Sequence, residues 1–93
     1  MEETVITFLF CLRRQGLSPA TVLWYRGRLA QCAYFFRCPV GGIDHDDLLR
    51  YAARLRHRRL SPATVEGHLR AINRFFGWCV EEGLLAESPV SAL

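Results

Sequence analysis

The chain has 93 residues, of which 51% are apolar and 12% aromatic. This is enough for one modest hydrophobic core and too apolar for a disordered tail. No apolar run approaches the roughly 20 residues of a membrane-spanning helix, and the acidic start Met1-Glu2-Glu3 is unlike a signal peptide. We therefore expect a single, monomeric, cytoplasmic domain that does not contact a membrane.

The charge is distributed more unevenly than the formal net charge of +3 suggests. All twelve basic residues are arginine. Residues 4–43 hold arginines and no acid, and residues 48–80 hold only one acid, Glu66. Arginine is suited to bidentate contacts with phosphates and base edges. Nucleic acid is therefore the first partner to consider.

The first predicted helix covers residues 4–15. Its apolar residues recur at helical spacing: Val5, Phe8, Leu9 and Leu12. Gly16 follows as a C-terminal stop, and Arg13 and Arg14 suit the negative end of the helix dipole.

A six-residue sequence, Leu-Ser-Pro-Ala-Thr-Val, occurs at 17–22 and again 43 residues later at 60–65. In each copy the serine, Ser18 or Ser61, is a good N-cap, and the proline behind it suits the first helical position. The chain is therefore predicted to form two helical hairpins in tandem. The repeat has two interpretations: a shared capping solution, or capping combined with a shared functional role.

The helices that follow the two copies have comparable faces. The apolar stripe of the second helix holds Val22, Tyr25, Leu29, Cys32, Ala33 and Phe36. That of the fourth helix, which covers residues 62–82, holds Val65, Leu69, Ile72, Phe76 and Cys79. At 100° per residue, Trp24 and Gly67 take the same angular position on the opposite faces. Trp24 there could pack on a neighbouring helix or contact a ligand.

A third helix is predicted to begin at the cap Asp44. Its stripe contains Leu48, Tyr51, Ala52 and Leu55, and it ends in the basic run 54–59. No stretch alternates with the period of a strand. We therefore predict an all-α, four-helix domain over residues 1–86. Residues 87–93 are expected to begin a linker or to dock elsewhere.

The sequence contains no recognisable catalytic constellation. It has no Gly-rich phosphate loop, and the histidines His45, His57 and His68 fall on separate predicted elements. The four cysteines lack metal-ligand spacing and are expected to be reduced and largely buried. A zinc site that includes His45 or His57 is the alternative. We expect a binding module without a cofactor or a metal, and not an enzyme.

The ordered set of motifs resembles the core-binding, SAM-like domain of tyrosine recombinases, the class that includes phage integrases. The resemblance covers nearly the whole chain and rests on Phe8-Leu9, Leu12-Arg13, 16–22, Tyr25, Leu29, Ile43-Asp44, Asp47-Leu48, Tyr51, 60–65, His68-Leu69, Ile72, Phe75-Phe76, 81–85 and Ser88-Pro89. It implies a four-helix SAM-like orthogonal bundle that forms half of a C-shaped clamp on double-stranded DNA and supports recombination and integration. It also implies a separate catalytic domain in the parent chain and a nucleoid-associated location.

The resemblance implies that the N-terminal parts of the second and fourth helices face the major groove. The matching positions are Ala20, Thr21, Trp24, Arg28, Ala63, Thr64, Gly67, His68 and Arg70. Gly67 departs from the longer polar side chain often found at its position. Arg59 and Arg74, from the arginine-rich segments, complete the expected DNA-binding set.

Physical reasoning about the residues leads to the same partner. Two capped helix N-termini presented together would form an anion site, and arginines behind them would supply the electrostatic part of the affinity. The alternative is a small helical protein-interaction module without DNA binding. Steep loss of binding with salt would distinguish the first from the second.

Overall fold

Four α-helices build the structure, a computed structural model that describes residues 1–90. Their bounds are α1 Glu2–Arg14, α2 Pro19–Phe36, α3 His45–His57 and α4 Pro62–Glu81, with a short 3-10 turn at Val40–Gly42. No strand occurs within residues 1–90. The predicted all-α fold and its four helices are confirmed.

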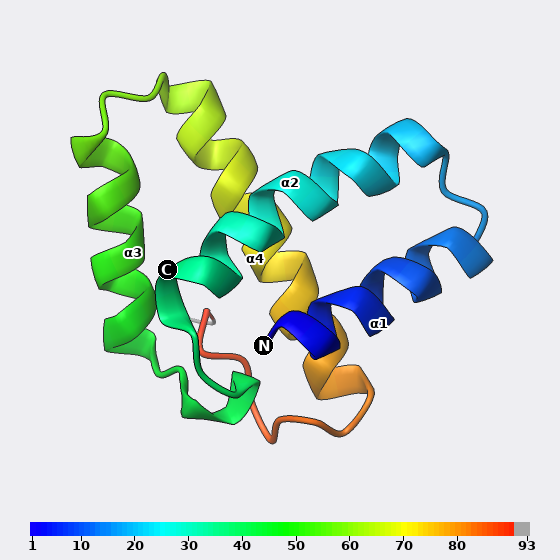
Figure 1. The fold of residues 1–93 in the computed structure, drawn as a ribbon. Helices are drawn as coiled ribbons and strands as arrows, with labels where there is room; N and C mark the ends of the chain where they lie inside the picture. The colour runs from blue at the N-terminus through cyan, green and yellow to red at the C-terminus, as the bar shows by residue number, and fades with distance from the viewer. Residues whose placement is uncertain (91–93) are drawn as a thin grey trace.

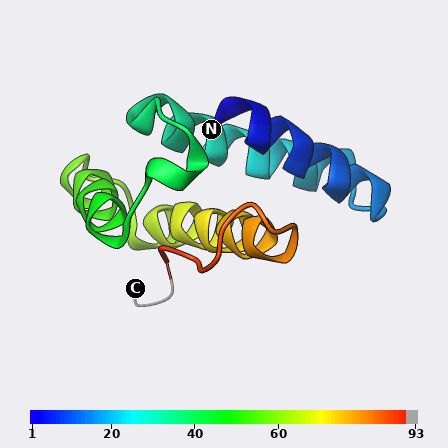
Figure 2. The same cartoon turned by 90° about the horizontal axis from the view of Figure 1, so that it is seen from below.

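The helices form two hairpins that pack across each other (Figure 1). α1 and α2 run antiparallel, and α2 crosses α4 near the middle of both helices. Seen from below, α1 and α2 make one layer, α4 lies in the layer beneath, and α3 closes one side (Figure 2). The arrangement is a SAM-like helical bundle in which α4 contacts all three other helices.

The ends of α1 and α4 follow the same backbone pattern. Gly16 has φ +91° and Gly83 has φ +74°, which are left-handed conformations that glycine adopts without a Cβ clash. The N–H of Leu17 donates to Leu12 O at 3.2 Å, and that of Leu84 donates to Cys79 O at 2.9 Å. These are the six-to-one hydrogen bonds of a Schellman motif, so both glycine stops are confirmed.

The core is aromatic where the two layers meet. Phe8 of α1 lies 5.5 Å from Phe75 and 5.4 Å from Trp78 of α4, measured between ring centroids. The stripes predicted for α1, α2 and α3 are buried or half-buried. The stripe predicted for α4 is also buried or half-buried. The burial on α4 extends beyond that stripe to Gly67 and His68, whereas Ala63, Arg70 and Arg74 on the opposite face are exposed as predicted.

The cysteines within the described residues are all free. Burial raises the pKa of the Cys32 thiol to about 12 and that of Cys79 to about 11, so both stay protonated near neutral pH. Cys11 and Cys38 are half-buried.

The segment after α4 turns back onto the domain. Val90 is buried in the core, and Nδ1 of His45 lies 3.0 Å from the carbonyl oxygen of Pro89. Packed structure therefore continues to Val90, past the linker start expected at residue 87. The last part of that expected linker, residues 91–93, lies outside the described residues.

Candidate nucleic-acid interface

The two copies of the repeat form nearly identical helix caps. Ser18 has φ −65° and ψ 153°, and Ser61 has φ −62° and ψ 153°. Each hydroxyl oxygen accepts a hydrogen bond at 3.2 Å from the N–H three residues on, that of Thr21 or Thr64. Both capping predictions are confirmed.

The two capped N-termini do not lie together. In Figures 1 and 2 the start of α2 and the start of α4 occupy well-separated ends of the bundle. The prediction that the two N-termini together form one anion site is therefore wrong. α2 and α4 come together one to two turns further along, at their crossing, because the hairpins pack crosswise rather than side by side.

The crossing is built from a large residue on α2 and a glycine on α4. A Cβ placed on Gly67 would lie 3.4 Å from Cζ2 of Trp24 and 3.5 Å from Nε of Arg28. Arg28 in turn lies with Cζ 4.2 Å from the centroid of the Trp24 ring, and its Nη1 donates to Trp24 O at 3.1 Å. Trp24 therefore packs on the neighbouring helix, as the first of its two interpretations predicted.

Beside the crossing lies a shallow hollow of about 350 Å³. It is lined by Ala20, Thr21, Trp24, Tyr25 and Arg70. Arg74 borders it, since its Nη1 donates to the Tyr25 hydroxyl at 3.2 Å. Side chains that the sequence placed on two separate helices thus share one solvent-exposed surface. We call Ala20, Thr21, Trp24, Arg28, Arg70 and Arg74 the crossing face.

The electrostatics of the crossing face are dominated by arginine. Arg70 pairs with Glu66 at 3.5 Å, but both side chains are well exposed. Such a surface pair contributes little to stability, so Arg70 can exchange this carboxylate for a phosphate. Arg28 is half-buried, and its buried Nε has no hydrogen-bond partner among the described residues. Its packing over the Trp24 ring and its hydrogen bond to Trp24 O hold the side chain in place.

Gly67 and His68 do not offer side chains to a ligand. Gly67 is covered by Trp24 and Arg28, and His68 is only 5% exposed. Burial lowers the pKa of His68, and the positive charges of Arg28 and Arg58 lower it further. The structure therefore makes both residues part of the packing beneath the crossing face. The reason for Gly67 is local, because Trp24 and Arg28 of α2 cover α4 at this point.

The other expected residues lie near the start of α4. Ala63 is exposed and Thr64 half-exposed on its first turn, and Arg59 is exposed in the loop before it. Arg59 has φ +60°, a left-handed conformation that costs a non-glycine residue roughly 1 kcal/mol. These three residues are set apart from the hollow, on the same helix as Arg70 or next to it.

The role of the Tyr25 hydroxyl was not predicted from the sequence. It was placed on the apolar stripe, and its ring is indeed buried, but its hydroxyl holds Arg74 at the hollow. The signal was available, because a buried tyrosine usually directs its hydroxyl to a polar partner.

Within residues 1–90, no three His, Cys, Asp or Glu side chains come close enough together to hold a metal ion. None of the helices in that range combines the length and apolar character needed to cross a bilayer.

Comparison with known proteins gives two results. Residues 7–84 match the family described as "Phage integrase, N-terminal SAM-like domain". The chain is also 30% identical over 98 residues to the tyrosine recombinase XerC of Roseiflexus castenholzii (strain DSM 13941 / HLO8). That alignment covers 100% of this chain and 31% of the relative, so the chain spans about a third of the relative's length. No solved structure gives a significant match.

The family match covers most of the chain and includes all four helices from the second turn of α1 to the end of α4. The helical bundle has the architecture that this family name describes. The chain therefore belongs to the N-terminal SAM-like domain family of phage integrases and tyrosine recombinases, and it is not the catalytic domain of such a protein.

Proposed function

We propose that this domain binds double-stranded DNA through the crossing face, as the DNA-binding part of a tyrosine recombinase whose chemistry resides in another domain. The observation that carries the proposal is the hollow at the α2–α4 crossing. Arginines from both helices converge there around Trp24, and Glu66 is the one carboxylate paired with them within residues 1–90. The recombinase relative supports the same partner.

The surface suits a duplex for physical reasons. Arginine on its rim can neutralise backbone phosphates, which supplies most of the non-specific affinity. The small side chains of Ala20 and Thr21 lie next to Trp24 on the first turns of α2. They leave room for a close approach of α2 to a groove, where base edges can be contacted.

Arg59 supports a binding role for the loop before α4. Its position corresponds, 43 residues on, to Gly16, and both have a left-handed φ. Glycine would adopt that conformation with less strain. The exposed arginine makes no hydrogen bond or ion pair through its side chain within the described residues that would offset the cost. A phosphate contact would explain why the strained position carries a cation.

A protein-interaction module is the second candidate, and one observation favours it. Ile6 and Phe10 on α1 and Leu23 on α2 are each more than half exposed. Exposed apolar groups of this size are typical of interaction surfaces when they adjoin. Binding through them would depend little on salt, in contrast to binding through arginines.

The test is a fluorescence-anisotropy titration of a labelled random duplex at several salt concentrations. With about four to six phosphates contacted, log K should fall against log salt with a slope of roughly −4 to −5, and Kd should lie near 10⁻⁴–10⁻⁶ M. Undetectable binding at about 50 mM salt would contradict the proposal.

Single substitutions localise the surface. Arg70→Ala should weaken duplex binding and reduce the salt slope by about one unit, with little effect on stability because the side chain is exposed. Arg13→Ala, at the end of α1, is the matched control and should bind nearly as the original protein does. Equal losses in the two variants would indicate diffuse attraction without a defined face.

Two further variants separate binding from folding. Arg59→Gly should weaken duplex binding while stability stays the same or rises by up to about 1 kcal/mol, because the left-handed strain is relieved. Arg28→Ala should lower both binding and stability, since Arg28 packs over Trp24 and Gly67.

A further inference from the structure

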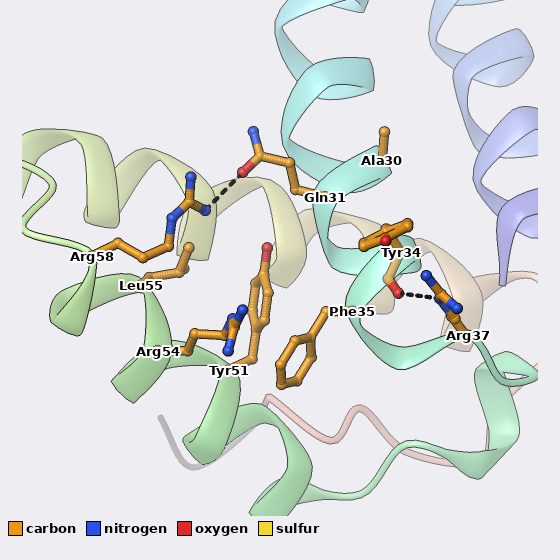
Figure 3. Close-up of a pocket in the computed structure, with 9 residues that line it drawn as sticks. All are labelled: Ala30, Gln31, Tyr34, Phe35, Arg37, Tyr51, Arg54, Leu55 and Arg58. Atoms are coloured by element: carbon orange, nitrogen blue, oxygen red, sulfur yellow. Dashed lines mark hydrogen bonds between the residues drawn. The ribbon is translucent and has the colours of Figure 1, made fainter.

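A second arginine-rich site lies away from the crossing face, in a cleft of about 700 Å³ between α2 and α3. Figure 3 shows its lining: Ala30, Gln31, Tyr34, Phe35, Arg37, Tyr51, Arg54, Leu55 and Arg58. We call this the α2–α3 cleft. It combines three arginines with three aromatic rings and has no carboxylate in its lining.

The polar groups of the α2–α3 cleft are almost all hydrogen-bond donors. Within residues 1–90, none of its three arginines forms an ion pair. The one side-chain carbonyl, that of Gln31, already accepts from Arg58 Nη1 at 3.2 Å. Arg37 donates to a backbone carbonyl at 3.2 Å. A ligand must therefore bring negative charge and acceptors of its own.

Tyr51 adds an unsatisfied donor. Its side chain is buried, with 3% exposure, and its hydroxyl has no hydrogen-bond partner among residues 1–90. In Figure 3 the hydroxyl points up between the helices toward Gln31 and Arg58. Burial raises the pKa of Tyr51, and this outweighs the opposite effect of Arg58 and Arg54. The hydroxyl therefore stays protonated and can donate once the exposed arginine side chains above it turn toward an anion.

The aromatic side chains of the α2–α3 cleft indicate which class of anionic ligand fits it. Tyr34 is 69% exposed, and Arg37 covers one part of its ring, with Cζ 4.3 Å from the centroid. Arg54 lies over Phe35 with Cζ 5.5 Å from its centroid. An inorganic anion or a carboxylate peptide would leave the exposed Tyr34 ring unused. A nucleotide offers a phosphate, acceptor atoms and a flat base together.

We propose that the α2–α3 cleft binds a nucleotide unit of single-stranded DNA, with its phosphate at Arg54 and Arg58 and its base against Tyr34. Stacked bases inside a duplex cannot reach such a ring, whereas unpaired bases stack readily on aromatic side chains. The site is separate from the crossing face. A variant can therefore lose single-strand binding and keep duplex binding, or the reverse.

The test uses the whole chain and a fluorescein-labelled oligo-dT of about ten nucleotides at low salt, within the usual site size of single-strand binders. Tyr34→Ala should weaken binding about fivefold or more. The double variant R54A/R58A should weaken it further and reduce the salt slope by about 1.4. Arg70→Ala, on the crossing face, should leave oligo-dT binding unchanged and weaken duplex binding.

Tyr51→Phe provides an independent measurement. It removes only the unsatisfied hydroxyl, so thermal stability should hold or increase, while oligo-dT affinity should fall. Thermal melts of all variants check that each one folds. Tyr34, Arg54 and Arg58 are exposed, so their substitution should leave the fold intact and a loss of binding can be assigned to the lost side chain.

Three results would overturn the proposal. The first is absent oligo-dT binding while the duplex still binds. The second is unchanged oligo-dT affinity in Tyr34→Ala. The third is competition by polyglutamate as effective as that of unlabelled oligo-dT with the same number of charges, which would make the α2–α3 cleft a general anion site.

Discussion

The α1–α2 hairpin and the α3–α4 hairpin share a six-residue sequence at the same point, yet the two helices that follow it have different surroundings. α2 keeps one side exposed, with Leu23 and Tyr34 open to solvent. α4 contacts all three other helices, and the side that it keeps exposed is mostly polar, with Glu66, Arg70 and Arg74. A 43-residue shift maps Trp24 onto Gly67, and these two residues pack against each other at the crossing. Equivalent positions thus carry a large and a small residue, and the crossing depends on that difference.

The turns of the two hairpins also differ. The first hairpin turns at Gly16, with φ +91°, and the second at Arg59, with φ +60°. Tyr25 is buried with its hydroxyl bonded to Arg74. It corresponds to His68, which is buried and whose Nδ1 has no hydrogen-bond partner within the described part of the chain. The first hairpin therefore has the less strained turn and the better-satisfied buried polar group. The difference is confined to these equivalent positions, because α2 also carries the buried Nε of Arg28, unpaired within residues 1–90, and ends at Arg37 with φ +51°.

The largest expected effect comes from filling the space at the crossing. Gly67→Leu should destabilise the domain by about 1–3 kcal/mol, because the longer side chain displaces Trp24 and Arg28. Gly67→Ala is the control: its Cβ makes ordinary contacts at 3.4 and 3.5 Å, and alanine favours a helix by up to about 1 kcal/mol over glycine. Urea unfolding measures both.

The same experiment in a Trp24→Ala background tests the pairing itself. The cost of Gly67→Leu should shrink there, since the space that Trp24 occupied is free. If leucine at 67 costs the same with and without Trp24, the two helices do not depend on this pair.

The next effect concerns the two caps. Ser18→Ala and Ser61→Ala should each lower the free energy of unfolding by about 1 kcal/mol, and replacement by glycine should cost only a few tenths. The two serines should behave alike, because the backbone angles and the 3.2 Å hydrogen bonds match. A much larger loss at Ser61, measured by chemical unfolding, would mean that the surroundings of α4 dominate over local capping.

The smallest effect is a pH dependence of the second hairpin. The pKa of His68 is lowered below its ordinary value of 6.5, first by burial and then by Arg28 and Arg58. Below pH 6.5 the unfolded chain therefore takes up a proton that the folded domain resists. Stability should be full above that pH and should decrease as the pH falls through 6.5 toward the folded pKa.

Thermal melts between pH 7.5 and 5.5 measure this decrease. His68→Gln should reduce the slope of stability against pH, whereas His57→Gln, at the exposed end of α3, should keep it. An identical slope in His68→Gln would show that other groups cause the pH dependence.

Much of the fold could be predicted from local sequence. The serine caps, the glycine stops and the apolar stripes of all four helices depend on residues within a turn or two of each other, so periodicity and capping chemistry suffice. The candidate site was predicted less well. Trp24, Arg70, Ala20 and Thr21 do share a surface, but His68 was expected there and is buried.

The sequence by itself determined closely where the helices begin and end, which apolar stripe of each helix is buried, and that the exposed positive charge is arginine. Only the tertiary structure decided that the hairpins cross, that Gly67 receives Trp24, and that the two capped N-termini stay apart. It also decided that Val90 returns to the core. The physical reason is the distance along the chain between the interacting residues. Hydrogen bonds within a turn are encoded by neighbours in the chain, whereas the crossing geometry depends on whether two side chains 43 residues apart fit each other in size.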